Sequence, residues 1–339
     1  MSFYLKNTLL LVQFIYILTF IKDDTNRVLA ALTTGIFILS CVIVALVIMD
    51  PGVLGGGRNA IEALCERYIG FHYNTLGTIY LTVGPLLVYL ARDRNLFAVA
   101  NLGLATLVIL ILQSRSALLV FVLASVITLV LIRRTGLLVV GAVAVALASG
   151  FWLGPTLSAV FSVGIDQGSV ESLDGLFTGR VEYLWVPLFS EWVSDPMLFL
   201  FGAGRYGILT SPLWASGQIL KAMHAHNAFL DFFLDSGAVL TIILIGTVVW
   251  LLARGYRVGR RLRNPLYWAL FMCAVAYLVG TLTERQFFPA VDNMLLFPLL
   301  AVMINVVRAH FAAGNAARVA HLSPRLSVRA MASPVPVRP

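Results

Sequence analysis

Long apolar runs recur along this chain and are separated by short polar stretches. Each run is rich in Leu, Val, Ile and Ala and has the length that crosses a bilayer as a helix. Because backbone polar groups must be satisfied internally in hydrocarbon, we interpret the runs as helices rather than barrel strands. The pattern predicts an all-α, polytopic transmembrane bundle of about nine spans, at residues 3–21, 28–49, 75–91, 96–113, 116–132, 136–153, 238–253, 266–282 and 287–307.

The longest interval between predicted spans, residues 154–237, has a helical pattern of its own. Its first part, 154–175, has little periodicity and is interpreted as loop. From Arg180 onward, apolar residues recur at helical spacing, which predicts one face of a three-turn helix. The residues on that face are Val181, Leu184, Trp185, Leu188, Phe189 and Trp192. Pro187 is expected to bend this helix, and the Asp195-Pro196 pair to end it.

A second short helix is predicted at the end of the same interval, from about Ala228 to Ser236. Asn227 suits the N-cap position, and Gly237 suits the position just beyond the last turn. His226 therefore lies directly ahead of a helix amino terminus. Near it in sequence, Gly202 and Gly204 permit a tight, irregular turn. The interval is thus expected to be a large loop that contains short helices.

Two shorter polar stretches also have a predicted structure. In 58–70, apolar residues repeat at helical spacing, which indicates an amphipathic helix lying on the membrane surface. Those residues are Ile61, Leu64, Cys65, Tyr68 and Ile69. Residues 113–116 are interpreted as a tight turn between two spans.

The predicted spans and the long interval between them divide the chain into N-terminal spans (1–153), a catalytic loop (154–237), C-terminal spans (238–307) and a disordered basic tail (308–339).

Composition and charge support a membrane protein and set its orientation. Hydrophobic residues make up 60% of the 339-residue chain and charged residues only 12%, against about one quarter charged in soluble domains. Every second connection between the predicted spans, beginning with the one between the first two, forms a set that includes the C-terminal tail. This set carries 16 of the 24 Lys and Arg residues. By the positive-inside rule this set is cytoplasmic, which places 154–237 on the opposite side. The net charge of +8 is thus a topology signal and does not indicate nucleic acid.

Four residues on the predicted outer side suit chemistry at a diphosphate: Arg67, Arg115, Arg180 and His226. Arginine binds phosphate with two parallel hydrogen bonds and keeps its charge. Histidine is the usual general base near neutral pH. A helix amino terminus beside His226 adds partial positive charge that favours a nearby phosphate. Together these residues predict a diphosphate substrate and a hydroxyl acceptor.

Each of these residues also has a plain structural interpretation. An outer-side histidine is most often a solvated polar residue, and Arg115 suits a turn at the membrane interface. Arg67 has Glu62 and Glu66 as possible ion-pair partners on its own helix. His224 is a second candidate for the base, two residues from His226. Other carboxylates that could act as bases, Glu182, Glu191, Asp231, Asp235 and Glu284, have no telling spacing, and no metal-ligand spacing or nucleotide-binding glycine loop was found.

The order of these motifs resembles the bacterial O-antigen ligase and polymerase family of membrane glycosyltransferases. The matching segments are ERYIGFHYNTLG (66–77), LQSRSALLVFVLA (112–124), TGRVEYLW (178–185) followed by FLFGAG (199–204), and HAHNAFLDFFLDSG (224–237). Each motif is short, but all occur in order on one predicted face, and the resemblance covers roughly residues 60–307.

The resemblance implies a role for each matching residue. His226 would be the base that activates an acceptor hydroxyl, and Arg180 with Arg115 would bind the diphosphate of an undecaprenyl-linked glycan. Arg67 matches a recurrent arginine. The remaining residues implied in substrate binding are Asn227, Gly202, Gly204, Arg205 and His224. The family is metal-independent and uses no cofactor, and it implies a multi-pass protein of the bacterial inner membrane with a periplasmic active site.

Several reactions remain open from the sequence. A ligase and a polymerase both fit; they differ in the acceptor, which is a lipid core in one and another glycan in the other. A transporter or flippase for the same lipid-linked polysaccharide is the alternative from another class, and a non-catalytic membrane scaffold is a third. Transporters tend to place ionisable residues near the bilayer midplane and to contain internal repeats. Neither feature is evident here, so we favour the transferase.

Overall fold

The computed structural model describes residues 15–16, 19, 24–93, 95–133, 180–219, 225–282, 296 and 298–312, without the side chains of Arg58 and Arg115. Helices dominate, and no strand occurs in these ranges. The all-α class is therefore confirmed for the described residues. The helices are α2 (Thr25–Met49), α3 (Gly52–Gly55), α4 (Gly57–Tyr68), α5 (Tyr73–Ala91), α6 (Leu96–Ile111), α7 (Arg115–Leu131), α11 (Val186–Ser194), α12 (Pro196–Phe201), α13 (Pro212–Ser216), α14 (Ala228–Leu262), α15 (Pro265–Gly280) and Pro298–Ala312.

Three helices are long and apolar enough to cross a membrane, judged by length and composition: α2, α5 and α14. Shorter apolar helices accompany them at Leu96–Ile111, Ser116–Leu131, Pro265–Gly280 and Pro298–Ala312. Each of these helices overlaps a run that the sequence predicts as a span. The last one continues through Ala312, past the boundary predicted at 307. The spans predicted at 3–21 and 136–153, and the loop at 154–175, lie outside the described residues apart from isolated positions near the amino terminus.

Helix α5 is the centre of the bundle, with α6, α7 and α15 packed around it. Its residues are buried from Tyr73 to Val88, so its polar side chains need internal partners. The hydroxyls of Thr78 and Thr82 donate to backbone carbonyls one turn earlier, at 3.1 and 2.7 Å. The Tyr80 hydroxyl lies 3.0 Å from the hydroxyl of Ser40 on α2. The polar side chains of this buried, mainly apolar helix therefore have internal hydrogen-bond partners.

Small residues allow α5 and α7 to approach closely. A Cβ on Gly84 would lie 2.6 Å from the ring of Phe121, and a Cβ on Gly77 would lie 3.0 Å from Ala117. In membranes such contacts replace the hydrophobic drive that water supplies to soluble helices. The predicted turn between α6 and α7 is present, with Gln113 in a left-handed conformation and Ser114 before the first residue of α7.

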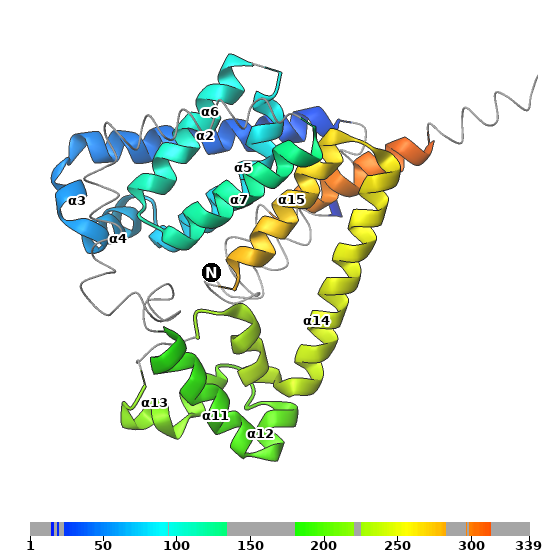
Figure 1. The fold of residues 1–339 in the computed structure, drawn as a ribbon. Helices are drawn as coiled ribbons and strands as arrows, with labels where there is room; N and C mark the ends of the chain where they lie inside the picture. Colours follow the sequence, from blue (N-terminus) through cyan, green and yellow to red (C-terminus); the bar gives the residue numbers. More distant parts are fainter. Residues whose placement is uncertain are drawn as a thin grey trace, which may run out of the picture.

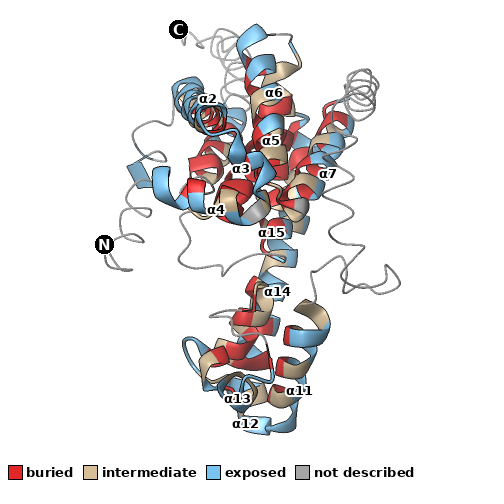
Figure 2. Ribbon diagram, turned by 90° about the vertical axis from the view of Figure 1, so that its left-hand side faces the viewer, coloured by how far each residue is buried: buried red, intermediate tan, exposed pale blue. Residues whose placement is uncertain are grey.

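The molecule has two parts, a bundle and a smaller lobe, and α14 runs from the lobe along the bundle (Figure 1). The lobe contains α11, α12 and α13. Figure 2 shows buried residues within the lobe as well as within the bundle. Each part has a hydrophobic core of its own.

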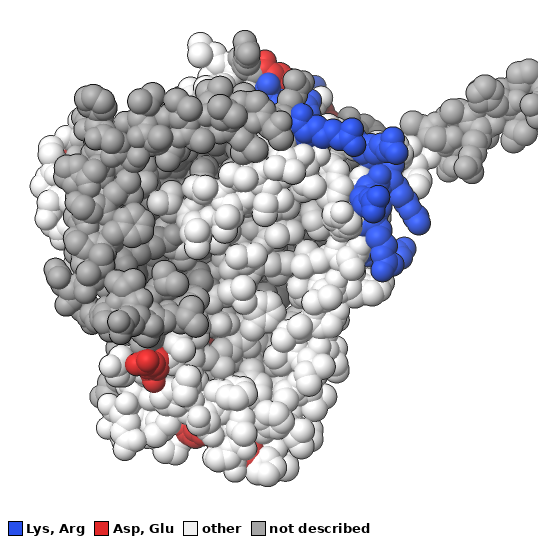
Figure 3. Space-filling model, viewed as in Figure 1, with Lys and Arg blue, Asp and Glu red and all other residues white. Residues whose placement is uncertain are grey.

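Basic residues gather at one end of the molecule. Figure 3 shows Lys and Arg side chains around the end of α14 and the start of α15, with acidic side chains both near this end and on the lobe. The basic residues at the end of α14 are Arg254, Arg257, Arg260, Arg261 and Arg263. These arginines belong to the connection that the sequence predicts to be cytoplasmic.

Helix α4 confirms part of the predicted amphipathic segment and corrects part of it. Ile61, Leu64 and Cys65 are buried against the bundle core. Tyr68, which was expected on the same apolar face, is 58% exposed. It lies in the last turn of α4, where its ring packs against the guanidinium of Arg67, 5.3 Å from the ring centroid.

Candidate active site

The lobe is built from residues 180–219 and 225–237 around a compact apolar core. The core residues, reaching the first residue beyond the lobe, are Leu184, Leu188, Trp192, Ile208, Ile219, Ala225, Phe233, Leu234 and Ala238. Residues from the Arg180 helix and from the start of α14 therefore meet in one core, although about 40 residues separate them in sequence. The lobe brings together two of the segments that the sequence singled out.

The helix predicted from Arg180 forms, with a local change of pitch. Val181–Trp185 is a π-helical turn, and α11 follows it directly. Pro187 lacks the N–H that an α-helix would need here, which favours the wider turn. Leu184, Leu188 and Trp192 are buried as expected, but Phe189 is 50% exposed. Phe189 lies at the edge of the predicted face, where its ring packs on the core residue Phe233 with the centroids 5.5 Å apart.

Helix α14 is broken near its beginning, at Gly237. The backbone there has φ 74° and ψ 177°, which is non-helical, so the residues from Ala228 to Ser236 form a separate short helix. The prediction of a helix end at Gly237 is confirmed. A Cβ on Gly237 would collide with the carbonyl oxygen of Leu200 and the nitrogen of Phe201. Only glycine suits this position, because of both its φ and its neighbours.

The break frees backbone carbonyls, and the glycine turn after α12 satisfies them. The carbonyl of Leu234 accepts from the backbone N–H of Ala203 at 2.9 Å and from the indole of Trp192 at 3.1 Å. The carbonyl of Asp235 accepts from Gly204 at 2.9 Å. Gly202 has φ 73°, and a Cβ on it would lie 2.5 Å from the Asp235 backbone. Gly202 and Gly204 thus lock the turn onto the short helix.

His226 has an unusual backbone conformation, with φ 55° in the left-handed region. For a residue other than glycine this costs roughly 1 kcal/mol. Both neighbours of His226 are held. The N–H of Ala225 donates to Asp231 Oδ1 at 2.6 Å, and its carbonyl accepts from the Trp185 indole at 2.7 Å. Asn227 caps α14 by accepting from the N–H groups of Phe229 and Leu230, each at 3.1 Å, which confirms the predicted cap.

The His226 loop joins the lobe to one end of the bundle. The N–H of Ala228 donates to the carbonyl of Thr281, just after α15, at 2.9 Å. The neighbouring Gly280 packs against Leu81 of α5. One turn before Leu81, Gly77 contacts Ser114, which precedes Arg115. A continuous series of contacts therefore connects the His226 loop to the amino-terminal end of α7.

The structure places the predicted site residues as follows. Arg180 is partly buried and begins the π-helical turn that carries Trp185 to the Ala225 carbonyl. Arg205 is exposed, and its Nη2 donates to the Tyr206 hydroxyl at 3.0 Å. The Arg115 side chain and the whole of His224 lie outside the described residues.

Two carboxyl groups on the short helix have raised pKa values and are therefore weaker acids than usual. Asp231 is only 5% exposed, and burial raises its pKa to about 7, against the lowering effect of the Ala225 N–H. Burial also raises the pKa of Asp235, opposed by backbone N–H groups of Gly207 and Tyr206 and by Arg205. Both residues precede Gly237 and so lie outside the span predicted from 238. At neutral pH a substantial fraction of Asp231 is protonated.

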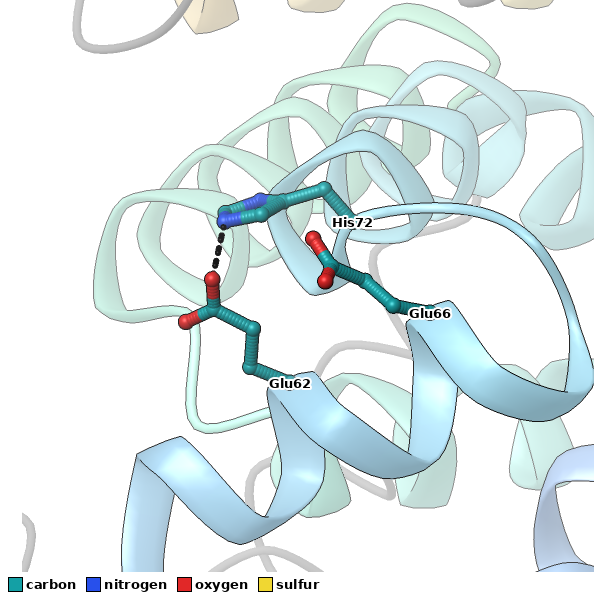
Figure 4. Close-up of side chains that lie close together, drawn as sticks. All are labelled: Glu62, Glu66 and His72. Carbon is teal, nitrogen blue, oxygen red and sulfur yellow. Dashed lines mark ion pairs between the residues drawn. The ribbon is translucent and has the colours of Figure 1, made fainter.

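A cluster of potential metal ligands lies where α4 meets α5, and the sequence analysis did not find it. Glu62, Glu66 and His72 bring their ligand atoms within 4.8 Å of one another (Figure 4). His72 Nε2 is 3.2 Å from Glu62 Oε1, and His72 Nδ1 accepts the N–H of Asn74 at 3.2 Å. Because Nδ1 is an acceptor, the ring proton of neutral His72 is on Nε2, which leaves no lone pair for a cation. In this arrangement the cluster links α4 to α5 by hydrogen bonding, and Glu62 pairs with His72 rather than with Arg67.

The role of His72 as the N-cap of α5 leads to a testable prediction. We expect His72→Ala to lower stability by about 1 kcal/mol, because Asn74 loses its acceptor, and His72→Asn to restore most of the loss. Thermal unfolding of the purified protein in detergent measures both. Equal destabilisation by the two variants would contradict the capping role.

Two residues that organise the His226 loop were not selected by sequence reasoning. Trp185 was assigned only to an apolar face, and Asp231 was named only as one of several carboxylates without a telling spacing. The one local signal was the place of Asp231, one turn into the helix that follows His226. Their contacts with Ala225 depend on the fold of the lobe.

These features define a class of protein: a helical protein with helices apolar and long enough to cross a membrane, and with a smaller lobe that holds a constrained histidine at its junction with the bundle. Residues 100–245 match the family model described as O-antigen ligase. This match supports a relationship between the segment and the O-antigen ligase family. The match runs from α6 into α14 and so includes Arg115, Arg180 and His226. A comparison with curated proteins finds no match.

Proposed function

We propose that this protein transfers an oligosaccharide from undecaprenyl diphosphate to a hydroxyl group of a glycan or lipid-core acceptor. The reaction takes place on the periplasmic face of the bacterial inner membrane, in the synthesis of cell-surface or exported polysaccharide. The observation that carries the proposal is the left-handed backbone of His226, held on both sides by hydrogen bonds, within the segment that matches O-antigen ligases. Strained conformations of this kind cluster at functional sites.

The proposed chemistry uses only the chain's own side chains. The acceptor oxygen attacks the anomeric carbon of the donor sugar and passes its proton to the imidazole of His226. The bond from that carbon to the diphosphate oxygen breaks, and undecaprenyl diphosphate leaves with the electron pair. Arg180 and Arg115 stabilise the charge that builds on the leaving group. Arg67, Arg205, His224 and the turn at Gly202 and Gly204 belong to the proposed substrate site.

The distribution of charge supports a transferase over a flippase. In the described apolar helices, Asp, Glu, Lys and Arg occur near the ends and not in the central turns, for example Arg27 in α2 and Arg254 in α14. Transporters of anionic substrates usually need ionisable groups deeper in the membrane. The described part of the chain therefore favours chemistry at the membrane surface.

The test is an in vitro transfer assay with purified protein in proteoliposomes. Radiolabelled undecaprenyl-diphosphate oligosaccharide is the donor, and release of undecaprenyl diphosphate is measured together with transfer of label to the acceptor. We expect His226→Asn to lower the rate by about 10²–10⁴-fold, the usual contribution of a positioned base. Asparagine tolerates a left-handed backbone, so this variant removes the base and keeps the loop. Arg180→Lys keeps the charge but loses the paired hydrogen bonds, and is also expected to reduce the rate.

His310→Asn is the matched control, because His310 lies on the last helix at an exposed position. It is expected to transfer at the wild-type rate. Full activity in His226→Asn would show that His226 is not the base. A larger loss of activity in His224→Asn than in His226→Asn would identify His224 as the base. Movement of labelled donor across the vesicle membrane without release of diphosphate would support the flippase instead. The length of the product distinguishes a single transfer, as by a ligase, from polymerisation.

A further inference from the structure

The left-handed backbone at His226 has to be held by its surroundings. An isolated residue at φ 55° would relax to a more favourable conformation. On the carboxyl side of His226, the cap made by Asn227 and the bond from Ala228 to Thr281 fix the chain. On the amino side, the peptide groups of Ala225 have two described partners: Asp231 for the N–H and Trp185 for the carbonyl.

Asp231 makes the shorter of these two contacts, at 2.6 Å, from the helix that follows His226. The side chain reaches back across the loop, so that residues 225–231 close on themselves. Rotation about the backbone bonds of Ala225 would change the direction in which the next residue, His226, leaves the loop. The carboxyl group of Asp231 therefore acts on the histidine through one backbone N–H.

The burial of Asp231 is not explained by stability. The side chain is 5% exposed, and Oδ2 has no hydrogen-bond partner among the described residues. A buried carboxyl group with one oxygen left unbonded costs more than a single neutral hydrogen bond returns. A residue that weakens the fold and yet fixes one peptide next to a strained histidine fits a role in the geometry of the site.

We propose that Asp231 is a positioning residue that holds His226 in its reactive orientation through the Ala225 N–H. This inference rests on the proposed function, in which His226 is the base. Asp231 itself touches neither substrate nor reacting atoms. A displacement of about 1 Å in a catalytic group can lower a rate by 10²-fold, which sets the size of the expected effect.

The test compares Asp231→Ala with Asp231→Asn in the same transfer assay. We expect Asp231→Ala to lower kcat by about 10- to 100-fold with little change in KM for the lipid-linked donor. Asp231→Asn keeps an oxygen that accepts the Ala225 N–H and is expected to recover activity to within a few-fold of wild type. This rescue is specific to the hydrogen bond, because the amide has no charge.

Asp195→Ala is the matched control for loss of a carboxylate in the same lobe. Asp195 caps α12 by accepting from the N–H groups of Met197 and Leu198 at 2.8 and 3.3 Å, and it does not contact the His226 loop. It is expected to lower the melting temperature without changing kcat of the folded protein. The proposal is overturned if Asp231→Ala loses activity only in proportion to its folded fraction, or if Asp231→Asn is as inactive as Asp231→Ala. Full activity in His226→Asn would instead show that His226 is not the base, so that the proposed function fails and not the positioning role of Asp231.

Discussion

Gly237→Ala is expected to unfold the lobe and abolish transfer. The added Cβ would meet the Leu200 carbonyl and the Phe201 nitrogen, both of which are backbone atoms that cannot move aside. The backbone conformation at Gly237, φ 74° with ψ 177°, is also one that only glycine adopts readily. Strain and overpacking together are expected to cost about 3–5 kcal/mol. Thermal unfolding, followed by the fluorescence of the lobe tryptophans, measures the loss.

Gly246→Ala provides the control in the same helix. Gly246 lies in the regular part of α14, has no atom within 4 Å of its Cβ position and is not in the left-handed region. Alanine there is expected to be neutral or stabilising by up to about 1 kcal/mol, since it favours the helix. If both variants melt like the wild type, the break at Gly237 is not a requirement of the lobe.

The second large effect is a fall in lobe stability as the pH rises. Burial raises the pKa of Asp231 from 3.8 to about 7. Between these values the folded lobe keeps a proton that the unfolded chain has released, so folding is favoured at the acidic end. Stability is therefore expected to decrease as pH rises through this window and to level off above pH 7, by at most about 4 kcal/mol for this group. Asp235, whose pKa is also raised by burial, changes stability in the same direction.

Asp231→Asn is expected to remove most of this pH dependence and to make the lobe more stable than the wild type at pH 8. The amide has no charge to bury and still accepts the Ala225 N–H. Melting temperatures between pH 5 and pH 8, in the same detergent and at the same ionic strength, check the prediction. A wild-type melting temperature that rises across this range would show that other titrating groups dominate.

Local features of the site were predicted well because their signals are local. The Asn227 cap and the end of a helix at Gly237 follow from single side chains and from backbone sterics. The burial of Leu184, Leu188 and Trp192 follows from helical spacing. Tyr68 shows the limit of that spacing, since a periodic pattern gives the direction of a face and not its width. What covers each face is decided by neighbouring elements.

The contacts that organise the site could not be predicted in this way. Trp185 and Ala225 are 40 residues apart, and the link from Ala228 to Thr281 spans a whole helical hairpin. No short-range pattern marks such pairs. The residues Glu62, Glu66 and His72 are close in sequence, but their meeting depends on the bend between α4 and α5, which the sequence pattern does not predict.

The sequence by itself determined that the described chain is helical and has helices apolar enough to cross a membrane. It also predicts which segment lies between spans and which residues suit diphosphate chemistry. These properties follow from hydrophobic length, charge asymmetry and side-chain chemistry, each of which is local. Only the tertiary structure decided that His226 takes a left-handed backbone and that Asp231 and Trp185 hold the N–H and the carbonyl of the preceding residue, Ala225. Such geometry arises from packing between distant segments, where the cost of a strained residue is offset by hydrogen bonds that the fold brings together.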